Sequence, residues 1–137
     1  MRFTDYDIDA KALSPLNLAF IGDCVYEMLV RETLVAKANR PVNDLHRESV
    51  KFVSAKAQTE AFEKIKDLLS EDETAQFKRG RNAKTGHMPK SATVAEYHTA
   101  TGVEALFGYL YINGRLDRIK ELFSVIDNEN DSKKAGT

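Results

Sequence analysis

The chain is short of cysteine, of net charge and of long apolar runs, and each shortage excludes a class of protein. A single cysteine, Cys24, cannot form an internal disulfide. No stretch approaches the roughly 20 consecutive apolar residues that cross a bilayer, so we expect no membrane partner. The first residues also lack the basic and then apolar order of a secretory signal. These absences predict a cytoplasmic protein.

Charge is nearly balanced overall but unevenly placed. The net charge of -1, from 20 Lys and Arg against 21 Asp and Glu, is not that of a strongly basic nucleic-acid binder. Residues 78–90 nevertheless hold five Lys or Arg and no acid. A length of 137 residues with 42% hydrophobic content is typical of one globular domain. The chain therefore predicts one domain with a local basic segment.

Sustained alternation of apolar and polar residues, the mark of strands, is absent as well, which predicts an all-α fold. Ser14 and Pro15 form a good helix start, because the hydroxyl can cap free N–H groups and proline suits the first helical position. Asn43 or Asp44 is expected to cap a second helix, and Ser91 or Thr93 a later one. The expected helices span residues 15–38, 43–65, 70–78, 93–113 and 116–126, with a loop at 80–89 and a tail at 127–137.

Two acids interrupt the most apolar helices. Asp23 is the only charged residue of the run 16–26, and Glu104 is the only one of the run 97–114. Burying an ionised carboxylate without a partner is costly, so such a group neutralises, pairs with a cation or binds a metal. Cys24, next to Asp23, is interpreted as a small core residue. The pattern leaves two alternatives open for the acids: a shared metal site, or separate pairing of each with a buried cation or helix cap.

Packing of the two helices against each other would bring both carboxylates into one pocket. Such an oxygen-only ligand set suits Mg²⁺ or Mn²⁺ rather than zinc. Two carboxylates are sufficient for Mg²⁺ when a phosphate of the substrate shares the ion. Glycines near these acids, Gly22, Gly102 and Gly108, are explained either by close helix crossings or by simple core packing.

The two acidic segments resemble motifs of the ribonuclease III catalytic domain. Residues 20–27, Phe-Ile-Gly-Asp-Cys-Val-Tyr-Glu, are similar to its signature helix, and residues 102–111, Gly-Val-Glu-Ala-Leu-Phe-Gly-Tyr-Leu-Tyr, resemble its second acidic motif. The resemblance covers roughly residues 13–123 and includes no double-stranded-RNA-binding domain, as in the mini-ribonuclease III branch. It implies a compact helical catalytic domain over residues 1–126, followed by a flexible tail over 127–137.

The resemblance implies a Mg²⁺-dependent endoribonuclease in which Asp23 and Glu104 are the catalytic and metal-binding residues. Its products would carry 5'-phosphate and 3'-hydroxyl ends. Three positions depart from the family pattern, since Leu16, Ala19 and Thr101 stand where acids are usual. Whether one or two ions bind is left open by these departures, which also motivate an alternative: a catalytically weak dimer that binds double-stranded RNA.

Family behaviour further implies a homodimer that accepts an RNA duplex between two sites. We predict that Leu16, Phe20 and Ile21 lie at the dimer interface. The substrate implied by the resemblance is the precursor of 23S ribosomal RNA, the large-subunit RNA, and a ribosomal protein bound to that precursor is a candidate partner.

RNA contacts are expected from the basic segment, because Lys and Arg bind backbone phosphates and read little sequence directly. The predicted RNA-binding residues are Arg79, Arg81, Lys84, His87 and Lys90. His46, in the second expected helix, either lies near RNA or caps that helix.

Overall fold

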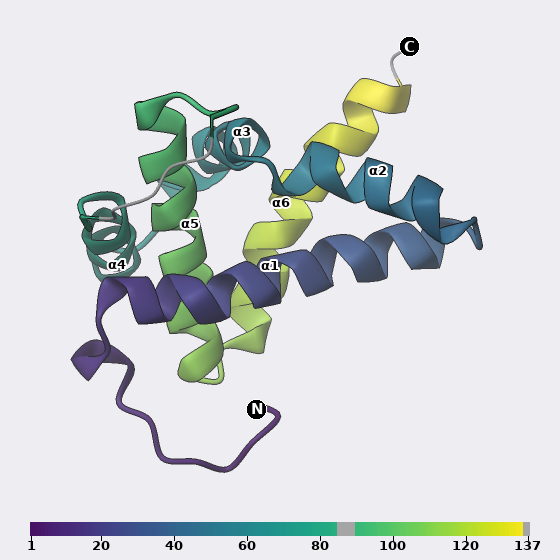
Figure 1. Cartoon of the computed structure of the whole chain (residues 1–137). Coiled ribbons are helices and arrows are strands. Elements are labelled where there is room, and N and C mark those ends of the chain that lie inside the picture. The colour runs from purple at the N-terminus through teal and green to yellow at the C-terminus, as the bar shows by residue number, and fades with distance from the viewer. Residues whose placement is uncertain (85–89, 136–137) are drawn as a thin grey trace.

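The computed structural model describes residues 1–84 and 90–135, with side chains described through Asp127. These parts of the chain are helical and contain no strand, which confirms the all-α class. Figure 1 shows the helices arranged around α5. The elements are η1 (Ala10–Ala12), α1 (Pro15–Lys37), α2 (Val42–Val53), α3 (Ala55–Ile65), η2 (Lys66–Leu68), α4 (Glu71–Arg81), α5 (Val94–Ile112) and α6 (Leu116–Ala135).

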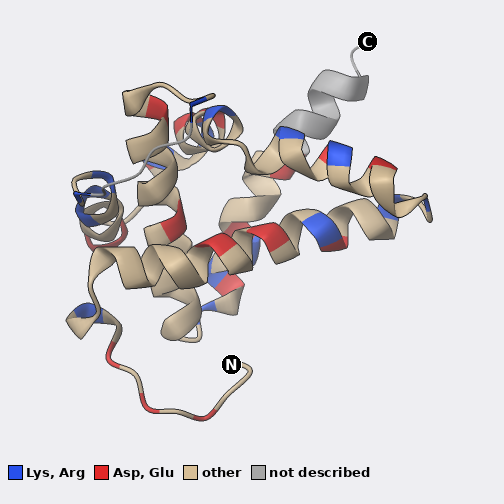
Figure 2. Cartoon of the chain, in the orientation of Figure 1, with Lys and Arg blue, Asp and Glu red and all other residues tan. Residues whose placement is uncertain are grey.

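The central helix is α5, which contacts α1, α3, α4 and α6. It begins after Thr93, whose side chain accepts a hydrogen bond from the Glu96 backbone N–H. Every residue from Ala100 to Leu110 is buried except Glu104, which is half-buried. In Figure 2 the α5 ribbon is correspondingly almost free of charged positions. The helix predicted from its apolar sequence is therefore the core of the protein.

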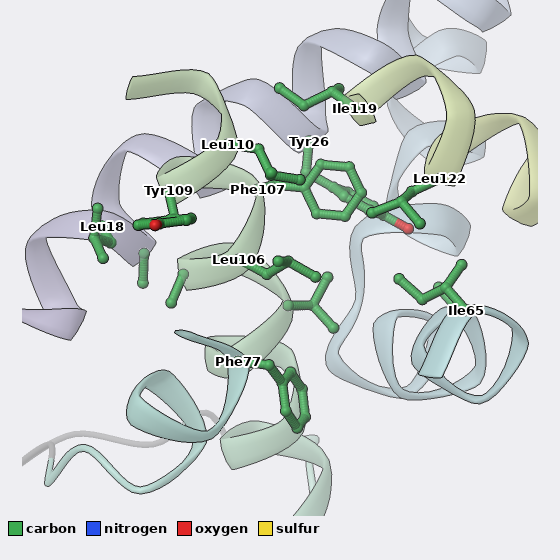
Figure 3. Close-up of a cluster of buried hydrophobic side chains, with 14 of the residues drawn as sticks. Leu18, Tyr26, Ile65, Phe77, Leu106, Phe107, Tyr109, Leu110, Ile119 and Leu122 are labelled. Atoms are coloured by element: carbon green, nitrogen blue, oxygen red, sulfur yellow. The ribbon is translucent and has the colours of Figure 1, made fainter. Parts of the chain in front are cut away.

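Aromatic rings fill the space between α5 and its neighbours. Tyr26 of α1 packs edge-on against Phe107 of α5, with ring centroids 5.2 Å apart, and Figure 3 shows these rings beside Leu122 of α6. On the other side, Phe62 of α3 and Phe77 of α4 stack with centroids 3.9 Å apart. The packed rings hold α1, α3, α4 and α6 in fixed positions around the middle of α5.

The first long helix, α1, begins as predicted but is not buried on all sides. The Ser14 hydroxyl accepts a hydrogen bond from the Asn17 N–H at 3.1 Å, and Pro15 is the first helical residue. Of the apolar residues on α1, Leu18 is buried, whereas Phe20 is 80% exposed and Met28 59% exposed. Cys24 is exposed too, so its prediction as a core residue is wrong. One side of α1 packs on the other helices, and the opposite apolar side faces outward.

The second predicted helix, residues 43–65, is divided at Ser54 into α2 and α3. Ser54 has extended backbone angles, and its hydroxyl accepts a hydrogen bond from the Ala57 N–H at 3.2 Å. One residue thus ends α2 and caps α3. The predicted caps Asn43 and Asp44 lie inside α2, which starts after Pro41 without a side-chain cap.

Two helix ends lie beyond their predicted positions. Helix α4 continues through Arg81, so Gly80 is helical and not the start of the predicted loop. A Cβ on Gly80 would lie 2.6 Å from the Ala105 Cβ, which shows that this glycine allows α4 to approach α5. Helix α6 continues to Ala135 instead of ending at Ile126. None of the described helices has the length and apolar character needed to cross a membrane.

Candidate metal and RNA site

A close crossing of α1 and α5 determines where the two acids lie. A Cβ added to Gly22 would overlap the Glu104 carbonyl oxygen, and one added to Gly108 would overlap the Leu18 carbonyl oxygen. The backbones of the two helices therefore touch at paired glycines. Because Asp23 follows Gly22 on α1, the crossing brings Asp23 beside Glu104 on α5.

The Asp23 and Glu104 side chains interact directly, as a hydrogen bond joins the two carboxyl groups. Asp23 is exposed and Glu104 is half-buried, so the expectation that both acids are buried is wrong for Asp23. Its exposure follows from its place at the edge of the contact between α1 and α5. The pair thus has one carboxyl group inside the crossing and one open to an approaching ligand.

Electrostatics favour a proton on Glu104 when no cation is present. Burial, the negative charge of Asp23 and the hydrogen bond between the two groups raise the pKa of Glu104 to about 8. A hydrogen bond from Gln58 acts in the opposite direction by favouring the ionised carboxylate. Two carboxylates in direct contact repel each other, so a proton or a cation between them is strongly favoured.

The donor set suits a hard divalent cation. Both side chains offer carboxylate oxygens, the ligands that Mg²⁺ and Mn²⁺ favour. Among the described residues, no group of three or more His, Cys, Asp or Glu side chains is placed to hold a metal ion. The pair therefore resembles a Mg²⁺ site that leaves most coordination positions to water and substrate oxygens.

The three positions that depart from the family pattern add no further carboxylate to the pair. Ala19 and Thr101 are both buried in the packed helices. The Thr101 hydroxyl donates a hydrogen bond to the Tyr97 carbonyl at 3.0 Å, one turn earlier in α5. These two residues belong to the core around the pair, and Leu16 is partly exposed on α1.

Gln58, on α3, is a further residue of the site and is not among the predicted ones. It is 2% exposed and hydrogen-bonds the Glu104 side chain. A signal for it exists in the sequence, because Gln58 shares its helix face with Ala61 and Ile65, both buried. A glutamine on an otherwise apolar helix face indicates a buried polar contact.

The predicted RNA-binding residues fall on α4 and on the segment that follows it. Arg81 lies in the last turn of α4, with its guanidinium carbon 5.7 Å from the centroid of the Phe77 ring. Lys84 and Lys90 are exposed. His87 lies outside the described residues. Arg81 and Lys84 thus lie on one side of residues 85–89 in the sequence, and Lys90 on the other.

Arg79 has partners within the protein. Its guanidinium donates to the Leu13 carbonyl at 2.9 Å and to the Gln76 side-chain oxygen at 2.8 Å. These bonds tie α4 to the segment that leads into α1. The geometry therefore gives Arg79 a structural contact in addition to its predicted contact with RNA.

His46 is exposed on α2 and does not occupy the cap position of that helix. It lines a groove with Arg31 and Leu45, between α1 and α2. Its carbonyl oxygen accepts a hydrogen bond from the Ser49 hydroxyl at 2.8 Å. Of the two alternatives for His46, the capping role is excluded.

The sequence is similar to a known family over most of its length. Residues 16–115 match the family model described as the ribonuclease III domain. The chain is 52% identical to "Mini-ribonuclease 3" of Thermoanaerobacter sp. (strain X514) over 114 residues, which cover 83% of this chain and 80% of the relative. It is 46% identical to "Mini-ribonuclease 3" of Symbiobacterium thermophilum over 80% of this chain and 85% of the relative.

A solved structure shares the fold. A crystal structure of a protein from Fusobacterium nucleatum superposes with a TM-score of 0.81 at 31% sequence identity. The match covers 90% of this chain and 99% of the other. The helical arrangement around α5 therefore also occurs in a solved protein.

Proposed function

The chain belongs to the ribonuclease III domain family and is an endoribonuclease, and on this premise we propose that Asp23 and Glu104 hold a divalent cation for the cleavage of double-stranded RNA. Members of the family act on double-stranded RNA and are usually dimeric. Mg²⁺ is the proposed ion, and Mn²⁺ is a substitute with similar ligand preferences.

The observation that carries this proposal is the direct contact between two carboxyl groups at the crossing of α1 and α5. Burial, and then the negative charge of Asp23, raise the pKa of Glu104, and a cation between the two groups would offset both effects. The proposal therefore places a cation where the fold already brings two carboxyl groups into contact.

When bound, Mg²⁺ lowers the pKa of a coordinated water and stabilises negative charge on the phosphate that reacts. Asp23, which is exposed, would be the ligand that α1 contributes, on the side from which an RNA backbone can approach. Glu104, which is half-buried in the crossing, would be the ligand that α5 contributes to the ion. Cleavage in this arrangement is expected to leave 5'-phosphate and 3'-hydroxyl ends, as the family resemblance implies.

A homodimer is the second part of the proposal, and the exposed apolar side of α1 supports it. Leu16, Phe20 and Ile21 are the proposed interface residues, and Phe20 is 80% exposed in the isolated chain. Ile21 also lines, together with Met28, an apolar groove of about 300 Å³. Exposed apolar side chains gathered on one side of a helix are typical of an interface, and a second copy of the chain would cover them.

The basic residues supply the proposed RNA contacts. Arg81, Lys84 and Lys90 are the best placed, because Arg79 already has partners on Leu13 and Gln76. His87 remains a predicted contact. Such residues would hold a duplex by its phosphates and its shape, with affinity that falls steeply as salt increases.

As the biological substrate we infer the precursor of 23S ribosomal RNA, processed in the cytoplasm, with a ribosomal protein on the precursor as a candidate accessory partner. The similarity to mini-ribonucleases supports this inference. A comparison of that precursor, with and without its ribosomal proteins, against an unrelated duplex tests it. Equal cleavage of all three substrates would contradict a dedicated role in the processing of this precursor.

The central experiment compares wild-type protein with Asp23→Asn and Glu104→Gln on a purified RNA duplex, with and without Mg²⁺. We expect either substitution to reduce the cleavage rate at least about 100-fold, as for other single groups that stabilise a transition state. Glu27→Gln is the matched control, because Glu27 lies one turn further along α1 and pairs with Arg31 at 3.0 Å.

Two results would contradict the proposal. One is cleavage by the wild type that does not depend on a divalent cation. The other is undiminished RNA binding with no Mg²⁺-dependent cleavage, which would instead support the alternative of a double-stranded-RNA-binding dimer with weak catalysis.

A further inference from the structure

Gln58 is a polar side chain buried on an otherwise apolar face of α3, and its presence there needs an explanation. It lies in the first turn of α3 and is 2% exposed. Its backbone N–H donates to the Ser54 carbonyl at 2.9 Å, so its position is set by the break between α2 and α3.

The side-chain amide of Gln58 connects two elements. Its Nε2 donates to the Val53 carbonyl at the end of α2, at 3.1 Å. The amide also hydrogen-bonds the Glu104 carboxyl group on α5. Because Glu104 as a carboxylate only accepts hydrogen bonds, the amide N–H is the donor in that contact. The amide nitrogen of Gln58 therefore serves both Val53 and Glu104.

The amide oxygen of Gln58 has no donor. Oε1 is buried and has no hydrogen-bond partner among the described residues. Rotating the amide by half a turn would turn this oxygen toward the Val53 carbonyl and the Glu104 carboxylate, which are both acceptors. The orientation is thus determined by Val53 and Glu104, at the cost of one unsatisfied acceptor.

This arrangement is poorly explained by stability alone. Ala61 and Ile65 share the helix face of Gln58, so an apolar side chain of similar size would fit the same surroundings without a buried, unpaired oxygen. A polar residue at this position provides two contacts that an apolar residue cannot, one with the Val53 carbonyl and one with the Glu104 carboxyl group. The first joins α3 to the end of α2, and the second reaches the carboxylate pair.

We propose that Gln58 is a positioning residue that holds the Glu104 carboxylate toward Asp23 and thereby sets the affinity of the pair for a divalent cation. The inference rests on the proposed function of that pair. A glutamate side chain has several rotatable bonds, and once both carboxyl groups are ionised, repulsion from Asp23 would turn Glu104 away. An N–H donor anchored on the end of α2 opposes that movement, as outer hydrogen bonds do around other metal ligands.

The experiment measures cation affinity directly and separately from catalysis. Mn²⁺ binding is measured by electron paramagnetic resonance of the free ion, for wild type, Gln58→Met and Gln58→Asn. Methionine keeps the length of the side chain without a donor, and asparagine keeps the amide but shortens its reach. Thr59→Val is the matched control, because the Thr59 hydroxyl donates to the Ala55 carbonyl within α3, at 2.9 Å.

We expect both Gln58 variants to bind Mn²⁺ at least about 10-fold more weakly than wild type, the lower end of the effect of removing a partner of a metal ligand. The Mg²⁺ concentration for half-maximal RNA cleavage should rise by a similar factor. Excess Mg²⁺ should restore much of the rate, which a general loss of folding would not allow. Thr59→Val should leave both quantities unchanged.

The outcomes separate this inference from the proposed function. If wild type binds no Mn²⁺, or Asp23→Asn binds as tightly as wild type, the metal site itself is wrong. If that site is intact and a folded Gln58 variant binds Mn²⁺ like wild type, the positioning role is overturned. Failure of both variants to reach wild-type helix content by circular dichroism would also overturn it, because Gln58 would then serve stability.

Discussion

Glu104 and Asp23 form a pair in which the interaction between the two carboxyl groups depends on the protonation of Glu104. At the scale of single residues this is the strongest electrostatic feature of the site. The folded protein raises the pKa of Glu104 to about 8, through burial and the nearby charge of Asp23. An unfolded chain would return the same group to its ordinary value near 4.5. Stability and cation binding are therefore linked to pH at one residue.

We predict that the free energy of unfolding of the metal-free protein contains a contribution that falls as pH rises from about 4.5 to about 8. In this window the folded state keeps a proton that the unfolded state has lost, so rising pH favours unfolding. Below the window both states are protonated, and above it the contribution is constant. Urea titrations in the presence of a chelator, at several pH values between about 5 and 8, measure the slope.

The control for this prediction is Glu104→Gln, which cannot titrate. The difference in unfolding free energy between wild type and the variant should change with pH, whereas titrating groups that do not contact Glu104 cancel in it. Mg²⁺ should stabilise wild type more at the upper end of the window, because the ion binds the ionised pair. A difference that stays flat across the window would contradict the raised pKa.

Gln58 explains how far the sequence could predict the site. Asp23 and Glu104 stand out as lone acids in apolar runs, so the sequence alone identifies both residues but leaves open whether they pair with each other. Their different exposure could not be predicted, because an apolar helix such as α1 has the same composition whether its outer side meets a core or a partner. Gln58 is distant from Glu104 in the sequence and meets it only because α3 packs on α5.

At the scale of elements, the crossing of α1 and α5 depends on two glycines. Gly22 and Gly108 allow each helix to contact the backbone of the other. The same contact holds Asp23 beside Glu104. A small change in the separation of these helices would therefore affect folding and the site together.

We predict that Gly108→Ala destabilises the protein by about 3 kcal/mol, since the new Cβ would overlap the Leu18 carbonyl and the backbone cannot easily move. Thermal or chemical denaturation measures the loss. The comparison is Ala95→Gly in the first turn of the same helix, where the residue is exposed and the expected cost is about 1 kcal/mol. A Gly108→Ala variant as stable as wild type would disprove the close crossing.

Some elements follow from local signals and others do not. The start of α1 follows from Ser14 and Pro15, and α5 follows from its apolar length. The break at Ser54 has no such signal, because the residues around it all tolerate a helix and the hydrogen bond to Ala57 is only one of several possible uses of the hydroxyl. Glycine is common in loops, so the sequence around Gly80 predicts a loop, whereas in the structure Gly80 lies in α4 and lets that helix approach α5.

For the molecule as a whole, the exposed apolar side of α1 raises the question of whether two copies of the chain associate through it. We predict that Phe20→Glu weakens self-association at least about 30-fold, as expected for an interface residue that contributes roughly 2 kcal/mol. The fold should persist, because Phe20 is 80% exposed. Sedimentation equilibrium measures the dimer dissociation constant. Val50→Glu, which changes an exposed apolar residue on α2, is the control and should leave that constant unchanged.

Electrostatic binding of RNA also belongs to the whole molecule, because the net charge is close to zero and only a local segment is basic. We predict that replacing Arg81 and Lys84 with alanine weakens duplex binding and lowers the slope of log affinity against log salt by about 1 for each lost phosphate contact. Lys56→Ala, an exposed change on α3, should leave the slope unchanged. An unaltered slope in the double variant would exclude the segment from RNA binding.

The exposure of Cys24 gives this protein a single position at which a spectroscopic label can be attached. It is the only cysteine of the chain, and it lies next to Asp23 on the outward side of α1. A maleimide dye or a nitroxide would therefore attach at one known place without mutagenesis. In a dimer formed through this side, two such labels would lie near each other, and their separation could be followed as RNA is added.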